Sequence, residues 1–167
     1  HVMARRQRQM CIRDSYNVAI GSHALETNVD GDGVVAIGYQ ALKTLEPSDG
    51  LNYNVGVGYN AGLSVSTGAR NVLLGGQAGD AITTGGGNIA IGFDSLSSED
   101  AGNYSIAIGE EALTAQNLSS GDNIAIGYQA GYSVSTGNAN VLIGNSAGGA
   151  LETGGFNVAI GLSLIHI

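Results

Sequence analysis

The phrase "NVAIG" at residues 17–21 occurs, with small changes, nine times along this chain and returns unchanged at residues 157–161. The copies between them are "VVAIG", "NVGVG", "NVLLG", "NIAIG", "SIAIG", "NIAIG" and "NVLIG". Aligned on their closing glycines, the copies follow one another at intervals of 17, 20, 17, 17, 17, 18, 17 and 17 residues. A short fixed period indicates a repeat architecture, and helical repeats need about 33 residues or more. We therefore predict an all-β parallel β-solenoid of about nine 17-residue coils over residues 16–161.

Each phrase reads as one short strand with two apolar faces. Branched residues stand one and three positions before the glycine, as Ile20 and Val18 do in the first copy. Residues two apart in a strand share a face, so we expect these Val and Ile columns to form the inside of the coil. The position between them is always Ala, Gly or Leu, and never charged. Because a strand that is apolar on both faces is usually buried on both, we expect this middle column to face outward and to be covered by a second copy of the chain.

Two further columns repeat with the phrase. Asparagine stands four positions before the glycine in seven of the nine copies, and Val34 and Ser105 replace it in the others. Stacked asparagines can pass amide hydrogen bonds from coil to coil, or can simply tolerate a turn, and both interpretations remain open. Four positions after the glycine, two leucines alternate with two glycines, which makes a larger unit that is visible in "AGLSVSTG" (61–68) and "AGYSVSTG" (130–137).

The repeats resemble those of a known class. "NVAIGSHAL" (17–25) and "NIAIGYQAGYSVSTGNANVLIGNSAGGALETGGFNVAIG" (123–161) are similar to repeats of phage tail fibre proteins and of the heads of trimeric autotransporter adhesins. The resemblance covers residues 16–161 and implies a left-handed parallel β-roll that assembles as a homotrimer into a rigid fibre. The 17-residue coil is longer than the roughly 14 residues typical of the adhesin heads, so the coil shape is expected to differ from theirs.

The two ends of the chain do not share the repeat. "RRQRQMCIRDS" (5–15) and "LSLIHI" (162–167) resemble translated sequencing-adapter sequence, and residues 1–4 fit the same origin. We therefore expect residues 1–15, taken as disordered, and residues 162–167 not to be native, and residues 16–161 to be an internal piece of a longer gene.

Charge and composition narrow the classes of partner. The whole chain carries a formal net charge of −8, but residues 16–161 hold two basic and thirteen acidic residues, which gives −11. Such an excess of negative charge disfavours binding to a phosphate backbone. The single cysteine, Cys11, lies in the adapter-like segment, so no disulfide or thiolate metal site is expected. No apolar run approaches the roughly 18 residues of a membrane span.

Two polar features could suggest chemistry. His23 stands in a polar, variable column and is expected to be a surface residue of a turn rather than a catalytic base. In "NVDGDG" (28–33), Asp30 and Asp32 alternate as the first two ligands of a calcium-binding loop do, but the other ligands of an EF-hand are missing. An acidic turn is therefore the better interpretation.

Two other features could suggest a ligand. Gly85, Gly86 and Gly87 lack the Lys-Ser/Thr that follows in a phosphate-binding loop, so a tight turn is expected. Aromatic residues follow the repeat glycine at four positions and could stack on sugars, although packing between neighbouring coils or chains is favoured; they are Tyr39, Tyr59, Phe93 and Tyr128. We expect no catalytic, cofactor-binding or metal-binding residue.

The leading functional hypothesis is a shaft or head segment of a trimeric surface fibre that mediates host or surface attachment. The fibre would belong to a phage tail or, alternatively, to a bacterial cell surface, with a host receptor or glycan as a further partner. A monomeric carbohydrate- or ice-binding β-helix is the second hypothesis, although the threonines group around turns. An enzyme built on a β-helix is third. A hexapeptide acyltransferase needs an apolar residue at every sixth position, and the steps from Ile20 reach Glu26 and Asp32.

Overall fold

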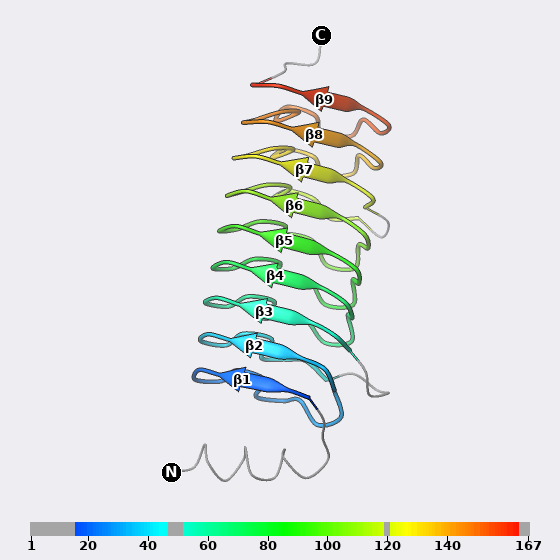
Figure 1. Ribbon diagram of the computed structural model, residues 1–167. Helices are drawn as coiled ribbons and strands as arrows, with labels where there is room; N and C mark the ends of the chain where they lie inside the picture. Colours follow the sequence, from blue (N-terminus) through cyan, green and yellow to red (C-terminus); the bar gives the residue numbers. More distant parts are fainter. Residues whose placement is uncertain (1–15, 47–51, 119–120, 164–167) are drawn as a thin grey trace.

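The computed structural model describes residues 16–46, 52–118 and 121–163, and these form a stack of flat coils (Figure 1). Each copy of the repeated phrase provides one three-residue strand. The strands are β1 (Val18–Ile20), β2 (Val35–Ile37), β3 (Val55–Val57), β4 (Val72–Leu74), β5 (Ile89–Ile91), β6 (Ile106–Ile108), β7 (Ile124–Ile126), β8 (Val141–Ile143) and β9 (Val158–Ile160). The described residues contain no helix. The adapter-like residues 1–15 and 164–167 lie outside the described part of the chain.

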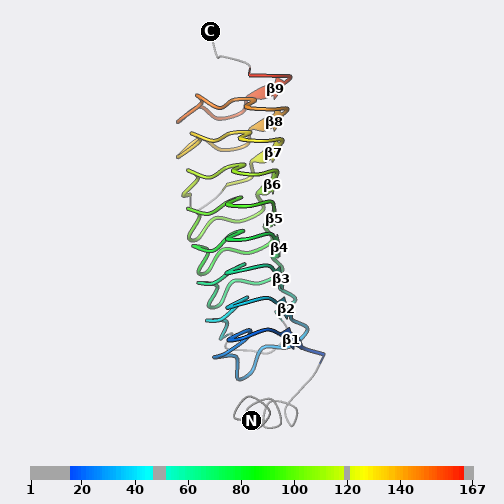
Figure 2. The ribbon, with the colours of Figure 1, turned by 90° about the vertical axis from the view of Figure 1, so that its left-hand side faces the viewer.

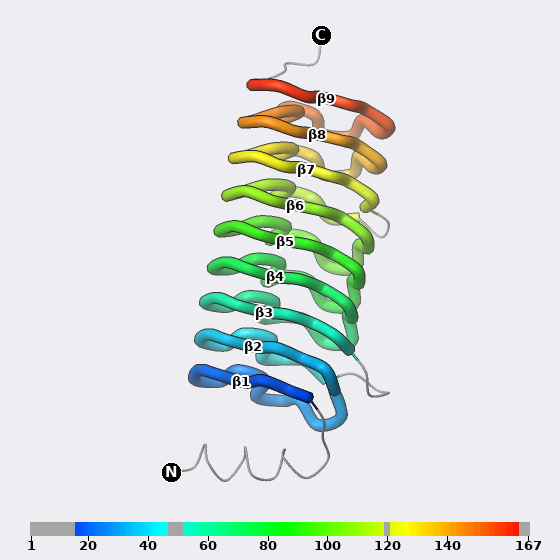
Figure 3. The backbone as a smooth tube through the Cα atoms, in the orientation of Figure 1, coloured from blue at the N-terminus to red at the C-terminus, as the bar shows by residue number. Residues whose placement is uncertain are grey.

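The nine strands form one parallel sheet in sequence order, from β1 to β9. Each strand pairs with the next in the register of the sequence repeat, so that Ala90 stands beside Ala107, for example. Figure 3 shows the chain passing from each strand through a turn, back along the opposite wall and into the next strand. The predicted all-β parallel solenoid is therefore confirmed, with about eight full turns between β1 and β9.

The wall opposite the sheet is built from turns rather than strands (Figure 2). Its backbone still forms a ladder between coils, because the amide four positions after each repeat glycine from Gly21 to Gly127 donates to a carbonyl of the next coil. The Leu42 amide donates to the Ala61 carbonyl over 3.0 Å, and the Leu96 amide donates to the Ala112 carbonyl over 2.9 Å. The two ladders together satisfy the backbone on both sides of the narrow core, as a buried backbone requires.

The repeat glycine is required by a close approach between coils. These nine glycines have φ between 128° and 143°, a region that L-residues with a side chain rarely adopt. A Cβ atom on Gly92 would also lie 2.4 Å from the carbonyl oxygen of Gly109 in the next coil. The sequence keeps glycine at this position in every copy because no other residue fits there.

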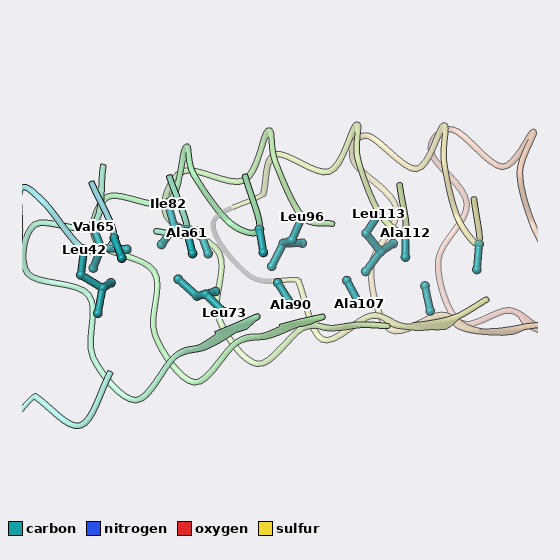
Figure 4. Close-up of a cluster of buried hydrophobic side chains, with 14 of the residues drawn as sticks. Leu42, Ala61, Val65, Leu73, Ile82, Ala90, Leu96, Ala107, Ala112 and Leu113 are labelled. Carbon is teal, nitrogen blue, oxygen red and sulfur yellow. The ribbon is translucent and has the colours of Figure 1, made fainter. Parts of the chain in front are cut away.

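The two faces of the sheet are the reverse of the sequence prediction. The middle residue of the strand, expected to face outward, is fully buried inside the coil from β2 to β8, whereas the flanking Val and Ile residues point outward and are half-buried. In Figure 4, Ala90 and Ala107 point from the strands towards Leu96 and Leu113 of the opposite wall. The interior is too thin for branched side chains from both walls, so small residues on the strands make room for leucines from the turns.

The core is filled by complementary sizes on the two walls. Leu73 in β4 lies between Gly62 and Gly79, where added Cβ atoms would stand 2.6 and 2.8 Å from its methyl groups. Leu142 in β8 is placed in the same way between Gly131 and Gly148. Where a turn carries leucine, the neighbouring strand carries Ala or Gly at the same height. This exchange of volume explains why two coils with leucine in the turn alternate with two coils with glycine there. A glycine in the turn leaves room for a leucine on the strand, so the core stays densely packed.

The leucines of the turn wall adopt a left-handed backbone. Leu25, Leu42, Leu96 and Leu113 have φ of 50°, 47°, 54° and 51°, at a cost of about 1–2 kcal/mol each for an L-residue. All four are at most 1% exposed, and burial of a leucine side chain contributes about 1.5–3 kcal/mol. Core filling therefore offsets a backbone conformation that glycine would adopt without strain.

The asparagine column forms a buried ladder that links the coils. Each side-chain oxygen accepts a hydrogen bond from the backbone amide at the same position in the next coil, as Asn71 Oδ1 does from the Asn88 amide over 2.9 Å. In every coil before the last that has this asparagine, the side-chain amide closes its own coil, as Asn71 Nδ2 does by donating to the Gly85 carbonyl over 2.9 Å. Of the two interpretations left open by the sequence, the ladder is the one observed. The asparagines do not have positive φ; the residues before them do, such as Arg70 at 63°.

Candidate interaction surface

The outward face of the sheet is an apolar surface that runs the length of the solenoid. It consists of the two Val/Ile columns of β1 to β9, in which Leu74 is the single residue of another type. Most of these side chains are half-buried by their neighbours along the column, and the end strands are more open, with Ile20 at 58% and Ile160 at 65% exposure. Neither column holds a charged or polar side chain. An apolar surface that runs along all nine strands is a candidate interaction surface.

Two further columns border this face, one at each end of the strands. The leading flank is the position directly before the asparagine column: Tyr16, Gly33, Tyr53, Arg70, Gly87, Tyr104, Asp122, Ala139 and Phe156. The trailing flank is the position directly after the repeat glycine: Ser22, Tyr39, Tyr59, Gly76, Phe93, Glu110, Tyr128 and Asn145. All the aromatic residues of both flanks are exposed, from 44% to 89%.

Aromatic residues of the flanks pack along the solenoid axis. The rings of Tyr39 and Tyr59 stack with centroids 5.4 Å apart and an interplanar angle of 12°. On the leading flank, Tyr53 lies over Gly33 of the preceding coil, where an added Cβ would stand 3.0 Å from the ring. The predicted packing between coils is thus observed, and it leaves substantial ring surface open to solvent.

His23 belongs to a small charged cluster at the first turns. Its Nδ1 lies 3.0 Å from a carboxylate oxygen of Glu26, and its ring meets Tyr39 edge-on with centroids 5.9 Å apart. The Lys43 ammonium lies 3.7 Å from the same Glu26 oxygen. The hydrogen bond from His23, helped by the charges of His23 and Lys43, lowers the pKa of Glu26. The imidazole is therefore held as a surface partner of Glu26, in agreement with the predicted turn position.

A second cluster on the turns brings acidic groups together. Burial, followed by the nearby charge of Asp94, raises the pKa of Asp80, and burial, followed by the charge of Glu111, raises the pKa of Asp94. Gln129 Nε2 donates a hydrogen bond to Glu111 over 2.7 Å. This row of carboxylates is a source of like-charge repulsion between successive coils.

The two sequence motifs that suggested ligands lie in the irregular connections between strands, where hydrogen bonds hold them to their own coil and to the next. In "NVDGDG", Asn28 Oδ1 accepts a hydrogen bond from the Gly31 amide over 3.1 Å, and the Asp32 carbonyl accepts one from the Asn52 amide over 3.0 Å. In the triple-glycine segment, the Gly86 amide donates to Asn103 Oδ1 over 2.8 Å. Across residues 16–46, 52–118 and 121–163, no three His, Cys, Asp or Glu side chains are grouped as metal ligands.

A buried polar network lies inside the core between β5 and β7, and sequence analysis missed it. The fully buried Glu99 carboxylate accepts hydrogen bonds from the Gly102 amide over 2.7 Å and from Gln116 Nε2 over 2.7 Å. Gln116 Nε2 also donates to Ser105 Oγ, and Gln116 Oε1 accepts from Asn123 Nδ2, each over 2.8 Å. Gln116 thereby bridges the asparagine ladder where Ser105 interrupts it. The available signal was that Glu99 and Gln116 share a column with Leu45, Val65 and Ile82, seven positions after the glycine.

Comparison with known proteins identifies no relative of this chain. No protein-family model, no curated protein and no solved structure matches the chain. Within the described residues, no helix is long and apolar enough to cross a membrane.

Proposed function

We propose that this chain is a non-catalytic, structural segment of a trimeric surface fibre that mediates attachment to a host or another surface. One observation carries the proposal: the Val/Ile columns of β1 to β9 face outward and form an uncovered apolar surface along the whole stack. Water disfavours such a surface by about 25 cal/mol for each Å² exposed, and copies of the same repeat offer a matching surface of equal length.

The covering surface differs from the one expected from the sequence. The Ala column cannot form an interface because it is enclosed in the core of its own coil. The Val/Ile columns take its place, and their branched side chains can interdigitate with those of another sheet as in a β-sandwich core. Three copies arranged around an axis parallel to the stack would each turn this face inward.

The stacked coils suit a mechanical role. Each coil extends the solenoid by about 4.8 Å, so the eight intervals span about 40 Å. Several copies held in one fibre present weak contacts together, which raises the overall avidity for a surface. The resemblance to phage tail fibre and adhesin-head repeats supports a location on a virion tail or a bacterial surface, with a receptor or glycan as the target.

Replacement of an outward isoleucine by lysine tests the proposal. We expect Ile91→Lys, at the centre of the face, to convert the assembly to monomers that keep the circular dichroism spectrum of the parent chain. Ser98→Lys, which adds the same charge at an exposed turn position, should leave the assembly intact. Multi-angle light scattering gives the mass in each case. A parent chain that is a folded monomer across dilution would contradict the proposal.

A second candidate function rests on the exposed aromatic flanks. Tyr39 and Tyr59 are 44% and 57% exposed, and exposed tyrosine rings can stack on the apolar faces of sugars. In this alternative, the chain is a monomeric carbohydrate-binding β-helix. A monomeric mass together with glycan binding that Tyr59→Ala abolishes would favour it over the fibre.

A further inference from the structure

Three successive strands of the solenoid have the same sequence. The strands β5, β6 and β7 each read Ile-Ala-Ile, and no other three neighbours among the nine strands are identical. In the structure, β5 pairs with β6 and β6 pairs with β7. A direct pairing of β5 with β7 would bring the same side chains together, so the strand residues alone do not specify the order of these coils.

The exchange of volume between strand and turn does not distinguish these coils either. It fixes the neighbours of β4 and β8, because Leu73 occupies the space beside Gly62, and Leu142 the space beside Gly131. The strands β5 and β6 both carry alanine in the middle, and a leucine follows each of them in the turn. If β7 followed β5 directly, the two walls of the core would still meet with matching sizes.

The buried polar network is the feature that distinguishes these three coils. The column seven positions after the repeat glycine carries Glu99 in the coil of β5, Gln116 in the coil of β6 and Val134 in the coil of β7. All three residues are fully buried. Glu99 Oε2 accepts from Gln116 Nε2 over 2.7 Å, and Glu99 Oε1 accepts from the Leu118 amide over 3.2 Å. Both donors belong to the next coil, so the partners of this carboxylate depend on which coil follows.

Gln116 is matched to the coils on either side of it. Its Nε2 donates to Ser105 Oγ in its own coil, and its Oε1 accepts from Asn123 Nδ2 in the coil of β7, each over 2.8 Å. A Cβ atom on Gly121 would lie 2.7 Å from Gln116 Nε2, so the space for this side chain depends on a glycine there. Together with its bond to Glu99, Gln116 joins one residue of the preceding coil, one of its own and one of the following coil.

A stack that omitted one coil would leave this network without partners. If β7 stacked directly on β5, Glu99 would lie beside Val134 and would lose its donors from Gln116 and Leu118. If β6 stacked directly on β4, Gln116 would lie beside Ile82 and would lose its acceptor on Glu99. A buried carboxylate or amide whose partner is removed is strongly destabilising.

We infer that the Glu99–Gln116 pair is a register lock, which makes the coils of β5, β6 and β7 stack in sequence order by destabilising stacks that omit one of them. Folding of a repeat protein can begin at several places and propagate, and misassembly between like repeats is a characteristic failure of such chains. A buried polar residue specifies register in coiled coils in the same way. The inference concerns contacts within one chain and does not rest on the proposed fibre.

Refolding of a variant without the pair tests the inference. Glu99→Leu/Gln116→Leu introduces the residue type that Leu45 and Leu151 provide in the same column. Because apolar replacement of a whole buried polar pair is often neutral or stabilising, we expect a urea midpoint at or above that of the parent chain. After dilution from urea, circular dichroism should show an additional slow refolding phase, in which chains with an omitted coil reopen.

Paired cysteines in a Cys11→Ser background identify the omitted coil. Ser98, Ala115 and Ser133 share the column six positions after the repeat glycine in the three coils. Ser98→Cys/Ser133→Cys places the thiols two coils apart in the correct stack, about 10 Å, which is too far for a disulfide. This pair should form a disulfide during oxidative refolding of the Glu99→Leu/Gln116→Leu variant but not of the parent chain. Ser98→Cys/Ala115→Cys, in neighbouring coils, should crosslink in both.

The matched control is Val65→Leu/Ile82→Leu, which changes two neighbouring residues of the same column and no polar group. It should refold with the phases and disulfides of the parent chain. If the Glu99→Leu/Gln116→Leu variant fails to fold, the pair serves stability and the inference is wrong. The inference is equally wrong if that variant folds without the additional slow phase and without the disulfide between positions 98 and 133.

Discussion

Shortening Leu73 to alanine tests whether the exchange of volume between strand and turn holds the solenoid together. Leu73 is fully buried, and its methyl groups occupy the space that a side chain at position 62 or 79 would need. Buried Leu→Ala changes cost about 2–5 kcal/mol, with the larger values where the cavity cannot collapse. Because the two residues across the core are glycines, neither has a side chain that can fill the space, and only neighbours such as Leu42 and Ile82 could shift towards it. We expect a loss of about 3–5 kcal/mol in the free energy of unfolding.

The same site offers a compensating change. Gly62→Leu alone should also destabilise the protein, by about 1–3 kcal/mol, because its side chain would collide with Leu73. The double variant with Leu73→Ala recreates the arrangement around β7. There the middle residue of the strand is Ala125, the turn of the preceding coil carries Leu113, and the turn of the same coil carries Gly131. We therefore expect the double variant to be more stable than the Leu73→Ala single variant.

Urea denaturation followed by circular dichroism measures these free energies, and Leu63→Ala is the matched control. Leu63 is only half-buried, so its truncation should cost about 1 kcal/mol or less. Amide hydrogen exchange in β3, β4 and β5 shows whether the loss is local to the altered coils, as expected for a stack in which each repeat contacts its neighbours. The reasoning is refuted if Leu73→Ala costs no more than Leu63→Ala, or if the effects of Leu73→Ala and Gly62→Leu simply add.

Three further predictions follow from the ladder, the core and the acidic row. Asn71→Ala leaves the Asn88 amide and the Gly85 carbonyl without partners in the core, so it should cost about 2–6 kcal/mol; Asn145→Ala, at the surface, should cost almost nothing by the same denaturation assay. Ala107→Glu would bury a charge between the walls and should abolish the folded circular dichroism spectrum, whereas Glu110→Ala should leave it unchanged; a folded Ala107→Glu variant would contradict the observed orientation of the sheet. Since the pKa values of Asp80 and Asp94 are raised above their ordinary value of 3.8, this row should favour the folded state most at acidic pH and do so less as the pH rises through the raised values. Asp94→Asn should therefore raise the urea midpoint at pH 7 and flatten its dependence on pH, and an unchanged pH profile would show that the row is not coupled to folding.

The candidate surface was only partly predictable from the sequence. The aromatic trailing flank and the need for a covered apolar face were visible as columns in the repeat, and the asparagine ladder was one of two open interpretations. The Glu99–Gln116–Ser105–Asn123 network was not predicted, because these residues come from two different columns and from separate coils. Only the stacking of coils brings their side chains within hydrogen-bond distance.

The period of the sequence by itself determined the coil, the strand, the parallel register and the place of every repeat glycine. It also determined that Val and Ile share one face of the strand and that Ala and Leu share the other, because side chains alternate along an extended backbone. Which face is inside was decided only by the tertiary structure. The opposite wall sends leucines across a thin core, and the volume left beside them accepts Ala or Gly but not two columns of branched residues. Alternation along a strand shows which residues share a face, but not which of the two faces is buried. Packing against the opposite wall decides that, because only one of the two faces fits it.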